Sequence, residues 1–262
     1  MFRRFWKLAQ SLLAHGAKGL IICSRGNSCI DAVSNLKKDF SLQSDVCIVG
    51  FQCDVSSKEG RRQLVQKIKD VFDNQLDGLI NNVGLNVRRS VEEQTESEYK
   101  QIMQTNIDSA YFLCKDLKEM LVNAAMNNGN AAIVNVSSAA GVQSSGTGAV
   151  YGMSKAAMIQ FSKVLACEWA KYNIRVNAVA PWMTMTPMLN ESIKSNPQQL
   201  DKVKAWTPMN RLATPEEVAG PITFLLMGSS SYITGQCLGI DGGLTAQGFD
   251  GPCVTLEVKN NH

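Results

Sequence analysis

The stretch from Ile133 to Lys155, "IVNVSSAAGVQSSGTGAVYGMSK", is the most informative part of the sequence. It starts as a short apolar run typical of a buried strand, passes through a loop rich in glycine and serine, and continues as a helical pattern. Tyr151 and Lys155 are four residues apart, so on a helix they share one face. Ser138 lies at the end of the strand, thirteen residues before Tyr151. The stretch therefore predicts a strand–loop–helix unit that gathers a serine, a tyrosine and a lysine.

These three residue types suit proton transfer to a carbonyl group. A tyrosine has an ordinary pKa near ~10, so it exchanges protons near neutral pH only beside a cation that stabilises the phenolate. Lys155 can supply that charge and can also donate to sugar hydroxyls, and Ser138 can donate to a substrate carbonyl oxygen. Taken alone, a tyrosine and a lysine at this spacing are most often a solvated helix face.

Outward from this stretch, apolar runs alternate with amphipathic helical patterns. Strand patterns cover residues 19–24, 46–55, 76–84, 131–138, 174–181 and 237–243. Helical patterns cover residues 5–15, 28–40, 60–72, 97–125, 149–171 and 214–226. Continuously apolar strands separated by helices indicate a parallel sheet covered on both faces. We predict a single α/β domain over residues 1–262, a doubly wound parallel sheet of the Rossmann-like kind, with residues 244–262 as a tail.

Composition narrows the possible functions. The chain has 262 residues, a formal net charge of +3 and 45% hydrophobic residues, which favours neither a nucleic-acid nor a membrane partner. The two histidines, His15 and His262, are too few for Ser-His-Asp, Cys-His or histidine-ligated zinc chemistry, and we expect no metal. The eight cysteines include no C-x-x-C pair, which favours reduced thiols and a cytoplasmic location. The basic N-terminus reads as a helix within the fold, with a mitochondrial presequence as the alternative.

Further motifs lie in order along the chain. They are "NNVG" at 81–84, "CDVSS" at 53–57, "MQTNIDSAYF" at 103–112, "RVNAVAP" at 175–181, "TPEEVA" at 214–219 and "ITGQCLGIDGG" at 233–243. With the Ser-Tyr-Lys stretch, they make the chain resemble the short-chain dehydrogenase/reductase family from about Leu8 to Gly243. Within that family the sequences of these motifs are most similar to those of tropinone reductases and related ketone reductases of plants.

The resemblance implies an oxidoreductase that transfers hydride between NADP(H) and a small ketone or secondary alcohol. It makes Tyr151 the general acid in reduction, with Ser138 orienting and polarising the carbonyl. It also assigns the nicotinamide ribose to Lys155 and a proton-relay water to Asn106. Such proton transfer typically contributes ~10²–10⁴ in rate.

The resemblance also implies a homodimer or homotetramer. The subunits would meet through the helices that contain Asn106 and Tyr151. Phe112, Met158 and Phe161 are apolar residues of those helices, and they could equally face the sheet.

Cofactor preference depends on Ser24 and Arg25, which end the second strand of the family pattern. A carboxylate there would bind the 2′-hydroxyl of NAD, whereas an arginine can accept the 2′-phosphate of NADP. We predict NADP(H); the alternative is that Arg25 is an exposed loop residue. The resemblance adds further cofactor-binding residues: Asp54, Val55, Asn82, Gly84, Tyr151, Lys155, Pro181, Thr184 and Thr186.

Residues 181–211 match the family's substrate loop. Apolar residues that could line a pocket there, or pack on the core instead, are Trp182, Met183, Met185, Met188, Leu189, Trp206 and Met209. Trp182 departs from the family, which usually has glycine there. The local backbone is in question if that glycine had a positive φ.

The start of the chain also departs from the family, which begins with a strand and a T-G-x-x-x-G-I-G loop. No stretch matches that loop in context, because "GAKG" at 16–19 follows a helix and precedes a strand. We therefore expect the chain to begin inside the helix that follows the loop, and the central strand position to be empty. Removing one strand leaves its neighbours about 10 Å apart.

Two hypotheses follow from this gap. The first is an NADP-dependent ketone reductase whose given sequence is incomplete. The second is a non-catalytic relative that keeps the fold and binds cofactor poorly. The tail "GPCVTLEVKNNH" at 251–262 alternates polar and apolar residues, so it could fill the gap, form an edge strand, contact another subunit or remain disordered.

Overall fold

The computed structural model describes residues 2–39, 46–185 and 197–248. The strands are β1 (Gly19–Ser24), β2 (Cys47–Gln52), β3 (Gly78–Asn81), β4 (Ala131–Val136), β5 (Ile174–Pro181) and β6 (Cys237–Ile240). The longer helices are α1 (Phe2–Ala14), α2 (Ser28–Asp39), α3 (Lys58–Phe72), α4 (Glu96–Met103), α5 (Ser109–Asn128), α6 (Ala149–Trp169), α8 (Pro197–Ala205) and α9 (Pro215–Leu226). This order confirms the predicted alternation of strands and helices in a Rossmann-like α/β fold.

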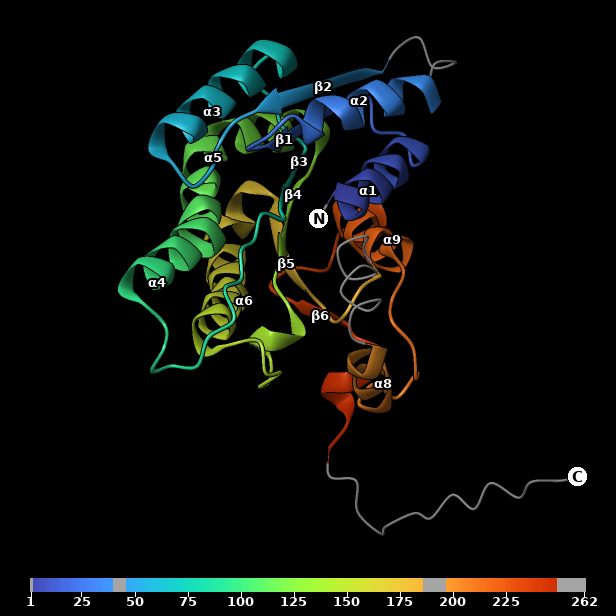
Figure 1. Ribbon diagram of the computed structural model, residues 1–262. Coiled ribbons are helices and arrows are strands. Elements are labelled where there is room, and N and C mark those ends of the chain that lie inside the picture. The colour runs from blue at the N-terminus through green and yellow to red at the C-terminus, as the bar shows by residue number, and fades with distance from the viewer. Residues whose placement is uncertain (1, 40–45, 186–196, 249–262) are drawn as a thin grey trace, which may run out of the picture.

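Helices cover both faces of the strands. Figure 1 shows α3, α5 and α6 on one side and α1, α2 and α9 on the other, with α8 at one end. The apolar strands β4 and β5 are buried along their whole length, as expected for strands covered on both faces. The α1 helix packs against α9 and α2 through buried Leu8, Ala9 and Leu13, so it is an integral part of the fold.

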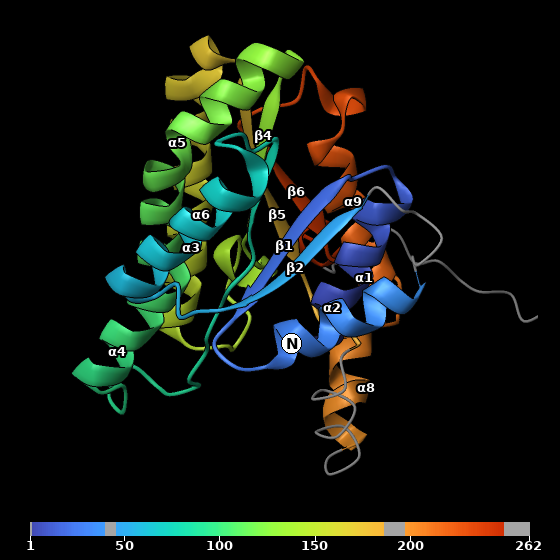
Figure 2. The same ribbon diagram turned by 90° about the horizontal axis from the view of Figure 1, so that it is seen from above.

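The strands fall into two parallel sheets. β1 pairs with β2 alone, while the second sheet has the order β3-β4-β5-β6. In the described residues no strand lies between β1 and β3, so the expected empty strand position is present. Figure 2 shows β1 and β2 side by side. The 251–262 tail, which could fill or flank the sheet, lies outside the described residues.

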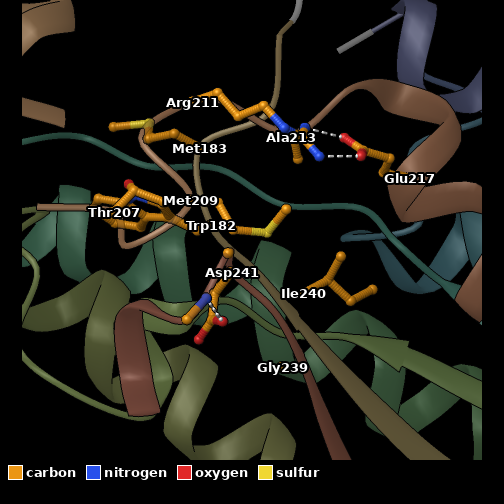
Figure 3. A pocket seen from close by; sticks show the side chains of 12 residues that line it. Trp182, Met183, Thr207, Met209, Arg211, Ala213, Glu217, Gly239, Ile240 and Asp241 are labelled. Atoms are coloured by element: carbon orange, nitrogen blue, oxygen red, sulfur yellow. Dashed lines mark hydrogen bonds and ion pairs between the residues drawn. The ribbon is translucent and has the colours of Figure 1, made fainter. Parts of the chain in front are cut away.

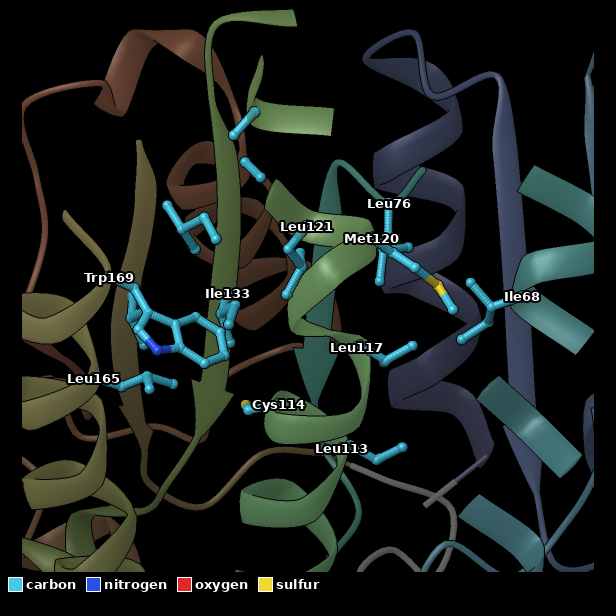
Figure 4. Packing of buried hydrophobic residues seen from close by; sticks show 14 of the residues in the cluster. Ile68, Leu76, Leu113, Cys114, Leu117, Met120, Leu121, Ile133, Leu165 and Trp169 are labelled. Carbon is cyan, nitrogen blue, oxygen red and sulfur yellow. The ribbon is translucent and has the colours of Figure 1, made fainter. Parts of the chain in front are cut away.

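The largest apolar cluster packs α5 and α6 onto the second sheet. Leu113, Leu117 and Leu121 recur every fourth residue on one face of α5, and all are buried. Figure 4 shows them with Ile133 of β4 and Trp169 of α6 in the same cluster. Burying one such leucine contributes about 1.5–3 kcal/mol. This packing fixes α6 against the sheet that carries the Ser-Tyr-Lys stretch.

The predicted helix over residues 97–125 is one continuous path with an internal irregularity. It begins at α4, whose Thr95 and Glu98 form a reciprocal capping box, and continues through α5. Between them, Gln104–Asp108 form a π-helical turn. Such a turn has a wider hydrogen-bond repeat than an α-helix and is frequent at functional sites.

A buried polar network joins the sheet to α6. Asn81 of β3 donates to the side-chain oxygen of Asn135 on β4 at 2.8 Å, and Asn135 donates to Ser162 Oγ of α6 at 2.8 Å. Asn135 and Ser162 are completely buried. Buried polar groups stabilise a fold only when they are paired, so this chain of bonds fixes the rotation of α6 on the sheet.

Replacing Asn135 by alanine should lower the free energy of unfolding by about 2–4 kcal/mol, because the Asn81 amide and the Ser162 hydroxyl lose a partner. Urea denaturation measures the loss. Asn128→Ala is the matched control, since Asn128 donates to Asp77 at the exposed surface, and it should cost under about 1 kcal/mol. Equal costs for the two variants would contradict the role of the network.

Candidate active site

The carboxyl ends of β3, β4 and β5 meet at one edge of the second sheet. Asn82 and Gly84 follow β3, Ser138 follows β4, and Pro181 ends β5. The short turn Ala139–Gly141 follows Ser138 and leads to α6, which begins two residues before Tyr151. Parallel strands expose their ligand-binding residues at this edge, and the structure brings these predicted residues together there.

Lys155 is held in the interior of this edge. Its side chain is 3% exposed, and Nζ donates to the Val136 carbonyl at the end of β4 at 2.9 Å. The ammonium lies 5.8 Å from the centroid of the Tyr151 ring. Gly84 is also close: a Cβ added there would lie 3.4 Å from Nζ. A buried positive charge therefore sits beside the tyrosine ring and the loop after β3.

Asn106 is fixed inside the π-helical turn. It is fully buried; its Oδ1 accepts from the Leu85 amide at 2.7 Å, and its Nδ2 donates to the Leu85 carbonyl at 2.9 Å. The same Nδ2 donates to Ser154 Oγ at 2.9 Å, and Ser154 in turn donates to the Tyr151 carbonyl. These bonds join the π turn, the loop after β3 and the first turn of α6.

Ser138 lies where β4 ends, on extended backbone with φ −165°. Its Oγ donates to the Pro181 carbonyl at 3.5 Å and accepts from the Ala140 amide at 3.2 Å. The turn that follows packs tightly on α6, because a Cβ added to Gly141 would lie 2.6 Å from the Lys155 carbonyl carbon. Ser138, Tyr151 and Lys155 thus belong to one packed unit.

A second group of predicted residues lies at the carboxyl ends of β1 and β2. Ser24 Oγ donates to the Gly26 carbonyl at 2.7 Å and accepts from the Cys29 amide at 3.2 Å, which fixes the start of α2. Arg25 is exposed. The carboxylate of Asp54 accepts from both the amide and the hydroxyl of Ser56, and Val55 is buried.

The substrate-loop residues have different surroundings. Trp182, Met183 and Met209 line a cavity of about 310 Å³ beside the end of β6 (Figure 3). The indole of Trp182 donates to Thr207 Oγ1 at 3.1 Å, and Trp182 is not among the described residues with positive φ, which removes the question about its backbone. Trp206, in contrast, is 69% exposed.

The threonines of this loop are placed only in part. Thr184 is buried and donates to the Trp182 carbonyl at 3.1 Å. Thr186, Met188 and Leu189 lie outside the described residues.

An ion pair closes one side of this cavity. Arg211 donates through two nitrogens to the carboxylate of Glu217, at 2.8 and 2.6 Å (Figure 3). Glu217 also forms a capping box with Thr214 at the start of α9, the helix that the sequence predicts over residues 214–226. The bond to Arg211 lowers the pKa of Glu217 to about 2. The pair holds the loop before α9 in place.

Several contacts of the site were not predicted from the sequence. Ser154 holds Asn106, and Ser137 Oγ donates to the Lys155 carbonyl at 2.7 Å. Gly141 allows the close approach of the turn to α6. The adjacent serines and the glycine in "SSAAG" were visible, but only tertiary structure reveals their partners.

Among the described residues, no group of three or more histidine, cysteine, aspartate or glutamate side chains could hold a metal ion. The described helices include none that is both long and apolar enough to cross a membrane.

Comparison with known proteins adds independent information. Residues 6–245 match a family model of the short-chain dehydrogenase/reductases that carries the description "Enoyl-(Acyl carrier protein) reductase". A tropinone reductase homolog of Arabidopsis thaliana is 38% identical over 242 residues, which cover 92% of this chain and 88% of the relative.

Two solved structures share the fold. The RhlG/NADP active-site complex of Pseudomonas aeruginosa has a TM-score of 0.82 and 32% identity, over 91% of both chains. The L-sorbose reductase of Gluconobacter frateurii, complexed with NADPH and L-sorbose, has a TM-score of 0.81 and 28% identity, over 91% of this chain and 90% of its own.

Gly141→Ala should destabilise the protein by about 1–3 kcal/mol, because the new Cβ would overlap the backbone of Lys155 and Ala156 and push α6 outward. Urea denaturation provides the measurement. Gly220→Ala is the matched control: it lies in α9 with no atom within 4 Å of the new Cβ, and should be neutral or stabilising. A Gly141→Ala protein as stable as the parent would show that the turn has more room than described.

Proposed function

Because the chain belongs to the short-chain dehydrogenase/reductase family, we propose that it transfers a hydride between NADP(H) and a small ketone or the corresponding secondary alcohol. The observation that carries the proposal is the packed unit at the carboxyl edge of the second sheet. There the buried ammonium of Lys155 lies 5.8 Å from the Tyr151 ring, and Asn106 is fixed to the same helix through Ser154. Similar proteins at 38% identity are tropinone reductase homologs.

We propose a separate role in carbonyl reduction for each residue of this edge. When bound, the nicotinamide supplies the hydride. Tyr151 donates the proton to the carbonyl oxygen, and the ammonium of Lys155 stabilises the phenolate that is left. Ser138 orients the carbonyl, for which its hydroxyl must leave the long 3.5 Å bond to Pro181. Asn106 is fully buried and bonded to Leu85 and Ser154, so it also fixes the π turn against α6, and its proton-relay water is part of the same proposal.

The nicotinamide end of the cofactor fits the residues present. Lys155 Nζ and Gly84 face the same space, and a side chain at Gly84 would crowd the ammonium. Asn82 and Pro181 border the same edge. We propose that these residues hold the ribose and nicotinamide.

The adenosine end depends on the β1–β2 sheet. Ser24 and Arg25 end β1, and an exposed arginine can pair with a 2′-phosphate. The solved structures of RhlG and of L-sorbose reductase contain NADP and NADPH respectively, which supports the same choice for this chain. The Asp54 carboxylate accepts two hydrogen bonds from Ser56. We therefore propose that Asp54 both stabilises the turn after β2 and contacts the cofactor.

The cavity beside Trp182 supports a small, largely apolar substrate. Met183 and Met209 offer flexible apolar walls, and the bond from Trp182 to Thr207 holds the indole against the segment before α9. We propose that this cavity receives the part of the substrate away from the reacting carbonyl.

One observation favours a second candidate function. The residues proposed for the two ends of the cofactor lie on separate sheets, with a cavity between β1 and β3. A non-catalytic relative that binds cofactor weakly is therefore the alternative. Titration of the protein with NADPH, followed by the fluorescence of the reduced nicotinamide, separates the two: binding supports the reductase, and no binding supports the relative.

We further propose a cytoplasmic homodimer or homotetramer. The seven described cysteines are all free thiols, which suits a reducing compartment. On the helices expected to form the interface, Tyr111 and Phe112 are 48% and 38% exposed and stack edge to face. Met158 is buried, so it is not part of such a surface.

Tyr151→Phe should remove turnover while leaving the fold intact, because it deletes only the phenolic proton donor. The assay follows NADPH oxidation with tropinone or another small cyclic ketone, after the parent protein is shown to be active. Tyr232→Phe, a change at a fully exposed tyrosine, is the control and should keep full activity. A Tyr151→Phe enzyme with more than about a hundredth of parental kcat would refute the assigned role.

Arg25→Asp should weaken NADPH binding by about 10–100-fold and leave NADH binding nearly unchanged, because it removes a partner of the 2′-phosphate and adds a repulsive charge. Dissociation constants for both cofactors, from fluorescence titration, provide the test. Arg62→Asp makes the same charge change on the exposed face of α3 and serves as the control. If the two variants alter the NADPH constant equally, Arg25 does not contact the phosphate.

A further inference from the structure

A buried positive charge near the start of α3 has no carboxylate partner. Arg61 is 7% exposed, and it takes part in none of the ion pairs that the described residues form. Its Nε is buried and has no hydrogen-bond partner among those residues. A buried charge without a counter-charge is costly, so stability alone does not account for this arginine. The contacts of its guanidinium point instead to the turn after β2.

The guanidinium lies between that turn and an aromatic ring. Nη1 donates to the carbonyls of Val55 and Ser56, at 3.0 and 2.9 Å. The central carbon of the group lies over the Phe112 ring of α5, 4.8 Å from its centroid. Figure 2 shows α3 beside α5, as this contact requires. A planar cation that stacks on a ring is fixed in orientation as well as in position.

Other contacts hold the same turn, which comprises residues 54–57. Asp54 Oδ1 accepts from the amide of Ser56 at 3.0 Å and from its hydroxyl at 2.7 Å. Gln104 of the π-helical turn donates to the Ser56 carbonyl at 3.2 Å. A Cβ added to Gly60 would lie 2.1 Å from the Asp54 carbonyl oxygen, so α3 rests directly on the turn. The turn is therefore packed against α3 and bonded to the π-helical turn.

One peptide unit carries the effect of Arg61 to Asp54. It joins Val55 to Ser56 and is planar, so its carbonyl and its amide point in opposite directions. Its carbonyl accepts from Arg61 and from no other described residue, while its amide donates to Asp54 Oδ1. Rotation of this unit would break both bonds. Arg61 thus sets the direction of the Asp54 carboxylate without an ion pair between the two side chains.

The turn still offers one acceptor and one donor to a ligand. Asp54 Oδ2 and the Val55 amide form no hydrogen bond with any described residue. An adenine edge has the complementary pair, because its exocyclic amine donates and the adjacent ring nitrogen accepts. The adenosine end of the cofactor, which we place beside this turn under the proposed function, carries that edge.

We propose that Arg61 is a positioning residue that orients Asp54 toward the adenine of NADP(H). This inference rests on the proposed function, since it concerns the same cofactor. Arg61 acts through the peptide unit and not by contact with the cofactor, so it affects selection of the base and not the chemical step. The planar group matters, because a lysine cannot both stack on Phe112 and hold two carbonyls in fixed geometry.

The test compares two cofactors that differ only at the adenine edge. They are NADPH and reduced nicotinamide hypoxanthine dinucleotide phosphate, in which an oxygen replaces the exocyclic amine. Fluorescence titration of the full chain gives both dissociation constants. The parent should bind NADPH about tenfold more tightly, because the hypoxanthine analogue cannot donate to Asp54 and brings two oxygens together.

Variants of Arg61 should remove this preference for adenine. In Arg61→Met the ratio of the two constants should fall below about twofold, because the carboxylate is no longer held in one direction. Arg61→Lys keeps the positive charge but not the planar group, and its ratio should fall below about threefold. Circular dichroism checks that the variants are folded. If Arg61→Met does not fold, the ratio in Arg61→Lys decides.

Arg62→Met is the matched control. It removes a positive charge from the next residue of α3, where Arg62 is exposed and pairs with Glu59. The ratio in this variant should equal that of the parent, because Arg62 makes no contact with the turn after β2.

Three outcomes would overturn the proposal and leave the proposed reductase intact, since NADPH still binds in each. They are equal binding of the two cofactors by the parent, an unchanged ratio in a folded Arg61 variant, and an equal fall of the ratio in the Arg62 control. Weakening of both cofactors by the same factor counts as an unchanged ratio and would make Arg61 a structural residue only. Absence of NADPH binding by the parent is different, because it would overturn the proposed function together with this inference.

Discussion

The parallel register of β3, β4 and β5 aligns the strand ends that hold Lys155 and Ser138. Asn81 is opposite Asn135, and Asn135 is opposite Ala178, so β3 and β4 end within one residue of each other while β5 continues to Pro181. The Val136 carbonyl at the end of β4 accepts a hydrogen bond from Lys155 Nζ. The Pro181 carbonyl at the end of β5 accepts one from Ser138 Oγ. The side chain of Asn135 carries the same register into α6 through Ser162. A shift of one residue in this pairing would turn the network toward the wrong face.

Much of the fold could be predicted from the sequence, because it rests on local patterns. The strand around Ile133, the helix over residues 214–226 and the empty strand position all follow from apolar runs, helical patterns and the absence of a glycine-rich motif. The π turn around Asn106 could not be predicted, because its cause is tertiary: the amide side chain bonds to Leu85 and Ser154, which are distant in sequence. The orientation of Met158 was equally open, since helical spacing alone does not say which side of α6 meets the sheet.

The site residues show the same division. Tyr151, Lys155 and Ser138 were identifiable from spacing, because their chemistry requires a strand end followed by a helix. Ser24 and Arg25, which we propose for cofactor binding, were selected from their place at a strand end. That these two groups occupy different sheets is a property of the whole topology. Arg175 is a further case: its guanidinium donates to the Leu225 and Met227 carbonyls and so caps the end of α9, a role that its place in an apolar strand does not reveal.

The split sheet has a consequence for how the protein unfolds. In the described residues no ladder bonds join β1–β2 to the larger sheet, so α1, which packs on both α2 and α9, is a principal mechanical link between them. Cooperativity then depends on side-chain packing, through α1 on one face and through the contact of α3 with α5 on the other, and the unit of β1, α2 and β2 can open at a lower free energy than the rest. A single melting temperature would describe neither unit. Spectroscopic signals from Trp169 would report an intact core even after the segment around Arg25 has opened.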